Sequence, residues 1–334
     1  MSLHTPRDRV LAALHGEVLD RPAMSLWQHW PVDDQQAGTY ARVSVEHRAA
    51  LGLDLVKLTP SAAFMAEAWG ARTTYDADPL GVRTYRSRPV TAPADWGAVA
   101  TLSVADSPTL RREVDAVRLV RAQVGPDVPV LPTVFTPLSV VRYLSGDGLF
   151  LAHLRRHRDQ VAPALRAIAA TSVALVRALL EAGADGIYFS LFPASDTMVS
   201  EAEYRAVALP FDQEVMAAAA DAPVRVAHFH LPFPLLALAR ELPVNVVSWE
   251  HTAGGPTLRD GMELTRRTVM GGVDQRLLAT AAGADVVRAT RAATRLARTP
   301  GTTGMILATS CSYPLTTPRG NLLAFTDTVR AAPA

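Results

Sequence analysis

Four side chains that could bind a metal lie where short apolar segments of the sequence end. They are His228, His230, Glu250 and Cys311. Imidazole nitrogen, carboxylate oxygen and thiolate sulfur form a donor set that suits zinc, with bonds of roughly 2.0–2.3 Å. Because alternate side chains of a strand point to the same side, His228 and His230 share a face and Phe229 points away. If the three segments meet at one place in the fold, these donors converge on one metal ion.

Each of these residues also has an interpretation without a metal. The two histidines could be hydrogen-bonded in the polar mouth of a barrel, and Cys311 could be a packed thiol. Glu250 could instead form an ion pair with Arg276 or Arg288. The occurrence of all four at matching segment ends favours the metal site. For Glu250 alone, the metal ligand and the ion pair are equally supported.

The segments that carry these residues belong to a series of eight. Each is short and rich in β-branched or aromatic residues, as is typical of a strand buried on both faces. The series comprises 23–27, 54–59, 128–135, 186–190, 224–230, 244–250, 268–273 and 304–311. Helical patterns separate most of them, which predicts an α/β fold, a (β/α)8 TIM barrel, as a single domain over residues 1–334.

Three further stretches are expected to be regular. Thr5, Pro6 and Asp8 predict a capped first helix that ends at Gly16. Alanine and leucine at helical spacing predict helices over 151–181 and 201–220. The stretch 71–105 breaks the alternation and predicts a small β-excursion.

Active sites of (β/α)8 barrels lie at the carboxyl ends of the strands, and this rule selects more candidates. Trp27, His29 and Ser190 are predicted to bind substrate. Lys57 lies in an otherwise apolar strand, so it needs a partner or a substrate anion. Pairing with Glu67 or Asp33 is the favoured outcome for this lysine, and a substrate-binding and catalytic role is the alternative.

Asp196 follows the fourth segment. It is predicted to orient a metal-binding histidine through a hydrogen bond, and it is a second catalytic candidate.

Composition excludes several classes of protein. The chain has 334 residues, a formal net charge of +1 and scattered arginines, so no nucleic-acid surface is expected. No run of eighteen apolar residues lacks charges, so no membrane span is expected, and the first residues do not resemble a signal peptide. The single cysteine excludes a disulfide within the chain and favours a reducing, cytoplasmic compartment.

Three segments of the sequence resemble a known superfamily. They read LFPASDTMVSEAEYRAVALPF, VAHFH and ILATSCSYPLTTPRGNLLAF. They are similar to segments of the uroporphyrinogen decarboxylase-like superfamily, which includes uroporphyrinogen decarboxylase, the corrinoid:thiol methyltransferases of methanogens and the C-terminal barrel of cobalamin-independent methionine synthase. The resemblance is closer to the methyltransferase and methionine synthase branch. It implies that His228, Cys311 and a further ligand, Glu250, bind zinc, with His230 where the family has cysteine.

The resemblance also implies a function. A zinc-dependent barrel of this branch transfers a methyl or other alkyl group to or from a thiol that is held as thiolate. The methyl donor would be a corrinoid on a partner protein or a small methylated compound. Because imidazole donates less charge than thiolate, His230 makes the zinc more acidic, which leaves a hydrolytic or lyase-like reaction on bound water as an alternative.

Decarboxylation of a porphyrinogen or a smaller carboxylate is the second hypothesis. In the RQAGR motif of the decarboxylase, this chain has Gln35 and Thr39 in place of the two arginines, and Cys311 occupies the position of a late histidine. Several arginines at the barrel mouth would favour this hypothesis. A non-catalytic module that binds a corrinoid or tetrapyrrole is the third hypothesis.

Overall fold

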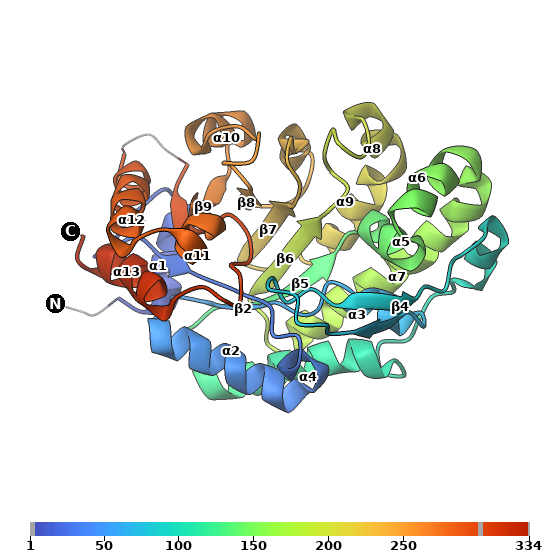
Figure 1. Cartoon of the computed structure of the whole chain (residues 1–334), viewed down its shortest axis with the longest axis horizontal. Helices are drawn as coiled ribbons and strands as arrows, with labels where there is room; N and C mark the ends of the chain where they lie inside the picture. The colour runs from blue at the N-terminus through green and yellow to red at the C-terminus, as the bar shows by residue number, and fades with distance from the viewer. Residues whose placement is uncertain (1–3, 300–302, 333–334) are drawn as a thin grey trace.

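Eight parallel strands form the centre of the molecule in a computed structural model that describes residues 4–299 and 303–332 (Figure 1). They are β1 (Met24–Ser25), β2 (Val56–Leu58), β5 (Val130–Phe135), β6 (Gly186–Leu191), β7 (Val224–Phe229), β8 (Val246–Trp249), β9 (Thr268–Val273) and β10 (Met305–Thr309). Their spatial order is β1-β10-β9-β8-β7-β6-β5-β2, which is a barrel open only between β1 and β2. The predicted (β/α)8 fold is confirmed.

Asp54 closes the gap between β1 and β2 through its backbone and its side chain. The backbone N–H of Asp54 donates to the carbonyl oxygen of Met24, and its carboxylate accepts the N–H of Met24, both at 2.9 Å. The same carboxylate accepts from Arg21 at 2.5 and 2.9 Å and from Arg9 at 3.3 Å. One side chain, 1% exposed, therefore replaces a strand ladder at this seam.

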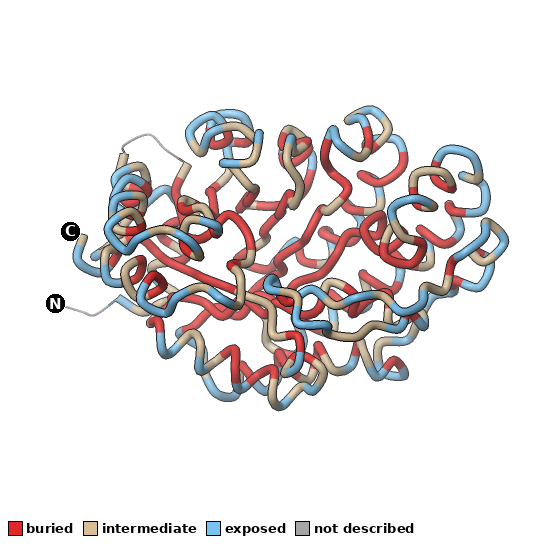
Figure 2. Tube along the Cα trace, in the orientation of Figure 1, coloured by how far each residue is buried: buried red, intermediate tan, exposed pale blue. Residues whose placement is uncertain are grey.

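Helices surround the strands, and burial separates the two layers (Figure 2). The helices are α1 (Pro6–Leu14), α2 (Ala37–Leu51), α3 (Phe64–Ala68), α4 (Pro108–Val124), α5 (Pro137–Ser145), α6 (Asp147–Arg156), α7 (Arg158–Glu181), α8 (Glu201–Val207), α9 (Leu209–Ala217), α10 (Leu258–Thr265), α11 (Gln275–Thr280), α12 (Gly283–Ala297) and α13 (Arg319–Arg330). Three short 3-10 helices are η1 (Asp33–Gln35), η2 (Pro93–Ala98) and η3 (Leu236–Arg240). Every residue of β5 and β6 is buried, as expected for strands that are largely apolar on both faces.

The expected helices are partly confirmed. The capping box of Thr5 and Asp8 begins α1 as predicted. The two long predicted helices are each divided. The backbone of His157 leaves the helical region between α6 and α7. Pro210 lies in the first turn of α9, where its missing N–H is tolerated, so a new helix begins there.

The stretch that breaks the alternation forms a hairpin of β3 (Arg72–Thr74) and β4 (Thr84–Ser87), as expected for the β-excursion. Its loop contacts the segment after β1, because a Cβ at Gly81 would lie 2.7 Å from the Cβ of His29. Arg83 donates to the carbonyl oxygen of Pro31 at 2.7 Å. The hairpin is thereby fixed at the edge of the barrel mouth.

One described helix, α7, is long and apolar enough to cross a membrane by length and composition alone. Half of the apolar window is buried inside the protein, with Val161, Leu165 and Ile168 in the core. Such burial is typical of a core helix.

Candidate metal centre

A cavity of about 360 Å³ opens at the carboxyl ends of the strands. Most of the predicted site residues line it. These are Trp27, His29, Lys57, Ser190, His228, His230 and Cys311. The rule of strand ends therefore placed seven of the nine candidates in one cavity, and the two others, Asp196 and Glu250, do not line it.

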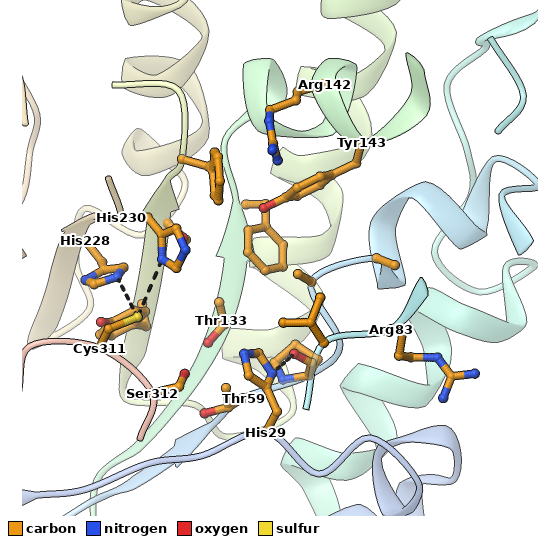
Figure 3. A pocket seen from close by; sticks show the side chains of 18 of the residues that line it. His29, Thr59, Arg83, Thr133, Arg142, Tyr143, His228, His230, Cys311 and Ser312 are labelled. Atoms are coloured by element: carbon orange, nitrogen blue, oxygen red, sulfur yellow. Dashed lines mark hydrogen bonds between the residues drawn. The ribbon is translucent and has the colours of Figure 1, made fainter. Parts of the chain in front are cut away.

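Three of the four predicted metal ligands meet on one side of the cavity (Figure 3). The Sγ atom of Cys311 lies 3.8 Å from Nε2 of His228 and 3.5 Å from Nδ1 of His230. All three donor atoms lie within 4.8 Å of one another. Tetrahedral zinc, with bonds of about 2.3 Å to sulfur and about 2.0 Å to nitrogen, holds these atom types about 3.5 Å apart. The residues present therefore fit a zinc ion.

Burial sets the protonation of these donors. It lowers the pKa of His230 to about 4, with Arg142 and Lys57 adding to the effect, and it holds the pKa of His228 well below its usual value. Burial and, to a smaller extent, the charge of Glu250 raise the pKa of the Cys311 thiol to about 12. At neutral pH both imidazoles are neutral and can donate a lone pair, whereas the sulfur must lose a proton when a metal binds.

Zinc affinity should therefore rise with pH. Between roughly pH 6 and 9 the histidines are already neutral and the thiol is protonated, so binding releases one proton and affinity rises about tenfold per pH unit. Competition with a chelator of known pH dependence measures this slope. Calorimetry in two buffers of different ionisation enthalpy counts the proton independently. A pH-independent affinity in this range would contradict the assignment of Cys311 as a ligand.

Ser248 fixes the orientation of His228. Its Oγ lies 3.1 Å from Nδ1 of His228, which leaves Nε2 facing Cys311. Asp196 was predicted to play such a part, but it is exposed, and its backbone N–H donates to the carbonyl oxygen of Phe233. The strand register explains the contact, because His228 on β7 lies opposite Ser248 on β8.

Replacing Ser248 by alanine should weaken zinc binding about tenfold, because groups that orient a metal-binding histidine typically contribute that much. Chelator competition on the Ser248→Ala variant measures the change. Ser190→Ala is the matched control, since Ser190 lies opposite His228 on the other neighbouring strand. Equal affinities of the two variants would show that the hydrogen bond to His228 does not matter.

Glu250 lies beside this group of donors rather than within it. It follows β8, is half-buried, and accepts a hydrogen bond from Nε2 of Gln275 at 3.1 Å. Neither alternative ion pair of Glu250 forms, since Arg276 pairs with Asp274 at 3.1 Å and Arg288 pairs with Asp285. Glu250 as a fourth ligand remains a proposal.

Lys57 is buried in the cavity wall and has no carboxylate partner among the described residues. Its Nζ donates to Oγ1 of Thr59 at 3.0 Å and of Thr133 at 3.1 Å. It lies 4.1 Å from the centre of the Tyr188 ring and burial lowers its pKa to about 7. The favoured pairing with Glu67 or Asp33 is wrong, since these carboxylates pair with Arg83 and Arg42 instead.

Other residues of the cavity were missed by the sequence analysis. They are contributed by the hairpin and by α5 rather than by strand ends, and include Arg83, Tyr85, Arg88, Arg142 and Tyr143. The one signal in the sequence was the segment VRTYRSR, a strand-like part of the β-excursion that carries several polar side chains.

Curated relatives with known activities share part of the sequence. One is the methylcobamide:CoM methyltransferase MtaA of Methanosarcina barkeri (strain Fusaro / DSM 804), 25% identical over 221 residues, which are 61% of this chain and 64% of the relative. Another is the methylcobamide:CoM methyltransferase MtbA of Methanosarcina mazei, 23% identical over 229 residues, 65% of this chain and 67% of the relative. The chain thus spans 64% of the length of the first relative.

Solved structures share the fold. A methyltransferase from Methanosarcina mazei superimposes with a TM-score of 0.84 at 23% identity, over 98% of both chains. A B12-independent methionine synthase from Shewanella sp. W3-18-1 gives a TM-score of 0.56 at 15% identity, over 93% of both chains. Residues 5–332 match the family described as uroporphyrinogen decarboxylase (URO-D). The chain therefore belongs to the URO-D family, in its branch near the methyltransferases.

Proposed function

We propose that the protein is a zinc-dependent enzyme that transfers a methyl or other alkyl group to or from a thiol. The observation that carries this proposal is the convergence of His228, His230 and Cys311 in a cavity at the carboxyl ends of the strands. The methylcobamide:CoM methyltransferases among the relatives support it.

The residues of the cavity have separate parts in this reaction. His228, His230 and Cys311 hold the metal, with Glu250 as the proposed fourth ligand. Bound zinc supplies the Lewis acidity that keeps a thiol substrate deprotonated and nucleophilic near neutral pH. Lys57, whose pKa is about 7, can accept the proton that the thiol loses. Trp27, His29 and Ser190 line the space for the substrate.

The methyl donor is proposed to be a corrinoid on a partner protein, which the printed names of the relatives suggest, or a small methylated compound. No nucleic acid or membrane takes part in this proposal, and the single cysteine supports a cytoplasmic location.

The test supplies zinc-loaded protein with methylcobalamin and a panel of small thiols. We expect loss of the methylcobalamin absorbance and formation of a thioether, both dependent on zinc. Protein stripped of metal and then reloaded is the matched control. A zinc-loaded protein that demethylates no donor with any thiol of the panel would overturn the proposal.

Decarboxylation is the second candidate, because Arg83, Arg88 and Arg142 all line the cavity. Release of CO2 from carboxylate substrates by metal-free protein would favour it. The third candidate, a non-catalytic corrinoid- or tetrapyrrole-binding module, predicts binding of cobalamin without turnover and without dependence on Cys311.

A further inference from the structure

A second cavity, of about 610 Å³, lies between α12 and α13, two helices that pack side by side on the outside of the barrel (Figure 1). We call this space, between residues 287–298 and residues 324–332, the α12–α13 groove. It shares no lining residue with the cavity at the barrel mouth. Its volume is within the usual range for pockets that bind small organic molecules, roughly 300–1,000 Å³.

One edge of the groove carries three arginines, Arg291, Arg295 and Arg298. They follow one another at spacings of four and three residues, so they share one face of α12 and its C-cap over about 10 Å. None of the three pairs with a carboxylate in the part of the chain that the structure describes. Like charges at this spacing repel one another, so an anion bound beside them stabilises all three.

The guanidinium group of Arg298 lacks an acceptor for one of its buried donors. Its Nε is buried and has no hydrogen-bond partner among residues 4–299 and 303–332, and its Nη2 donates to the carbonyl oxygen of Asp20 at 3.4 Å. A buried donor without a partner is costly, so an acceptor that enters the groove gains affinity. Because Asp20 precedes β1, this end of the groove lies at the amino ends of the strands, away from the candidate metal ligands.

The rest of the groove is mostly apolar. Its lining includes Val287 of α12 and, from α13 and the residue after it, Ala324 and Ala331. Asp327 is the one acidic residue of the lining within the described ranges. Its side chain is 67% exposed and pairs with Arg330 at 2.8 Å, so it does not neutralise the three arginines of the groove. The groove therefore combines an apolar wall with a row of unpaired cations.

We propose that the α12–α13 groove is a second ligand site, which binds a small amphipathic anion. Such a ligand is an organic molecule with an apolar body and a carboxylate, sulfonate or phosphate group. The body lies against the apolar wall, and the anionic group accepts charge-assisted hydrogen bonds from the arginines. A mainly apolar pocket with a few converging polar groups is typical of small-ligand sites. The site is remote from the barrel mouth, so this inference does not rest on the proposed function.

The test is a fluorescence titration with two dyes that share one apolar body. One dye, 8-anilinonaphthalene-1-sulfonate, carries a sulfonate, and the other, N-phenyl-1-naphthylamine, is uncharged. We expect the sulfonate to bind at least about tenfold more tightly, because only this dye can pair with a guanidinium group. Arg295→Met should remove this preference, and Arg291→Met should reduce it. Ala324→Trp should weaken the binding of both dyes, because the larger side chain fills the groove.

Arg288→Met is the matched control, because Arg288 lies on the same helix but outside the groove, where it pairs with Asp285. This variant removes the same charge and should leave the affinities for both dyes unchanged. Arginines also line the barrel mouth, so the variants decide where the sulfonate binds. Equal affinities of the parent protein for the two dyes overturn the proposal, as does an affinity for the sulfonate that is the same in Arg288→Met and Arg295→Met.

A macromolecule in the groove would give a different result. We expect the parent protein and the Arg295→Met variant to have the same mass in sedimentation equilibrium, because a small ligand site needs no second copy of the chain. A dimer of the parent protein that dissociates in Arg295→Met would make the groove an interface between copies and overturn the proposal. Bound zinc should be equal in the parent and in every groove variant, since the groove shares no residue with the metal site.

Discussion

Replacing Cys311 by serine should reduce bound zinc from about one ion per chain to a small fraction of that and abolish methyl transfer. Cys311 contributes the only sulfur among the candidate ligands. Its replacement leaves two neutral imidazoles, a hydroxyl that does not ionise near neutral pH and the proposed ligand Glu250. We expect zinc affinity to fall on the order of a thousandfold, since a zinc site built on about four ligands has a binding free energy of roughly 10 kcal/mol or more. Plasma mass spectrometry of the purified protein and chelator competition measure both quantities.

Two further variants make this result specific. His228→Ala should lose zinc in the same way. Ser312→Ala should retain zinc, because Ser312 lines the same cavity next to Cys311 but is not one of the candidate metal ligands. Full zinc content in both Cys311→Ser and His228→Ala would show that these residues are only polar lining.

Replacing Asp54 by alanine should lower the free energy of unfolding by about 3–5 kcal/mol, the usual cost of removing one partner from a buried ion pair. The substitution leaves Arg21 without its carboxylate and removes the acceptor for the N–H of Met24. Both contacts lie at the seam between β1 and β2, where no ladder exists to compensate. Urea unfolding followed by circular dichroism measures the change.

An exposed ion pair is the comparison for this effect. Asp115 pairs with Arg118 one turn away on α4, and both side chains are at least 40% exposed. Asp115→Ala should change the free energy of unfolding by less than about 1 kcal/mol. Similar losses in the two variants would mean that Asp54 does not close the barrel.

The sequence alone could predict the barrel and the centre of the site because both depend on local patterns. Each strand is buried on both faces and therefore appears as an apolar run, and the carboxyl ends of parallel strands meet at one end of a barrel. His228, His230 and Cys311 end such runs, so their convergence follows from the fold.

Other features depend on contacts that no local pattern encodes. The ammonium group of Lys57 donates hydrogen bonds to the hydroxyls of Thr59 and Thr133 and does not pair with a carboxylate. Two hydroxyls give no charge pattern that could be recognised in the sequence. Ser248 contacts His228 only because of the register between two strands. Tyr85, Arg88 and Arg142 of the cavity were missed because they lie on or next to the hairpin and on α5, whose approach to the mouth is set by tertiary packing.

The environment of Cys311 also bears on oxidative damage. Peroxide and molecular oxygen attack thiolates far more readily than thiols, and a buried thiol whose pKa is about 12 is almost entirely protonated in the cell. The chain has no second cysteine with which it could form an internal disulfide. The metal-free protein should therefore resist sulfenic acid formation in air. Loss of zinc would then be a reversible inactivation, repaired by the metal alone without a reductant.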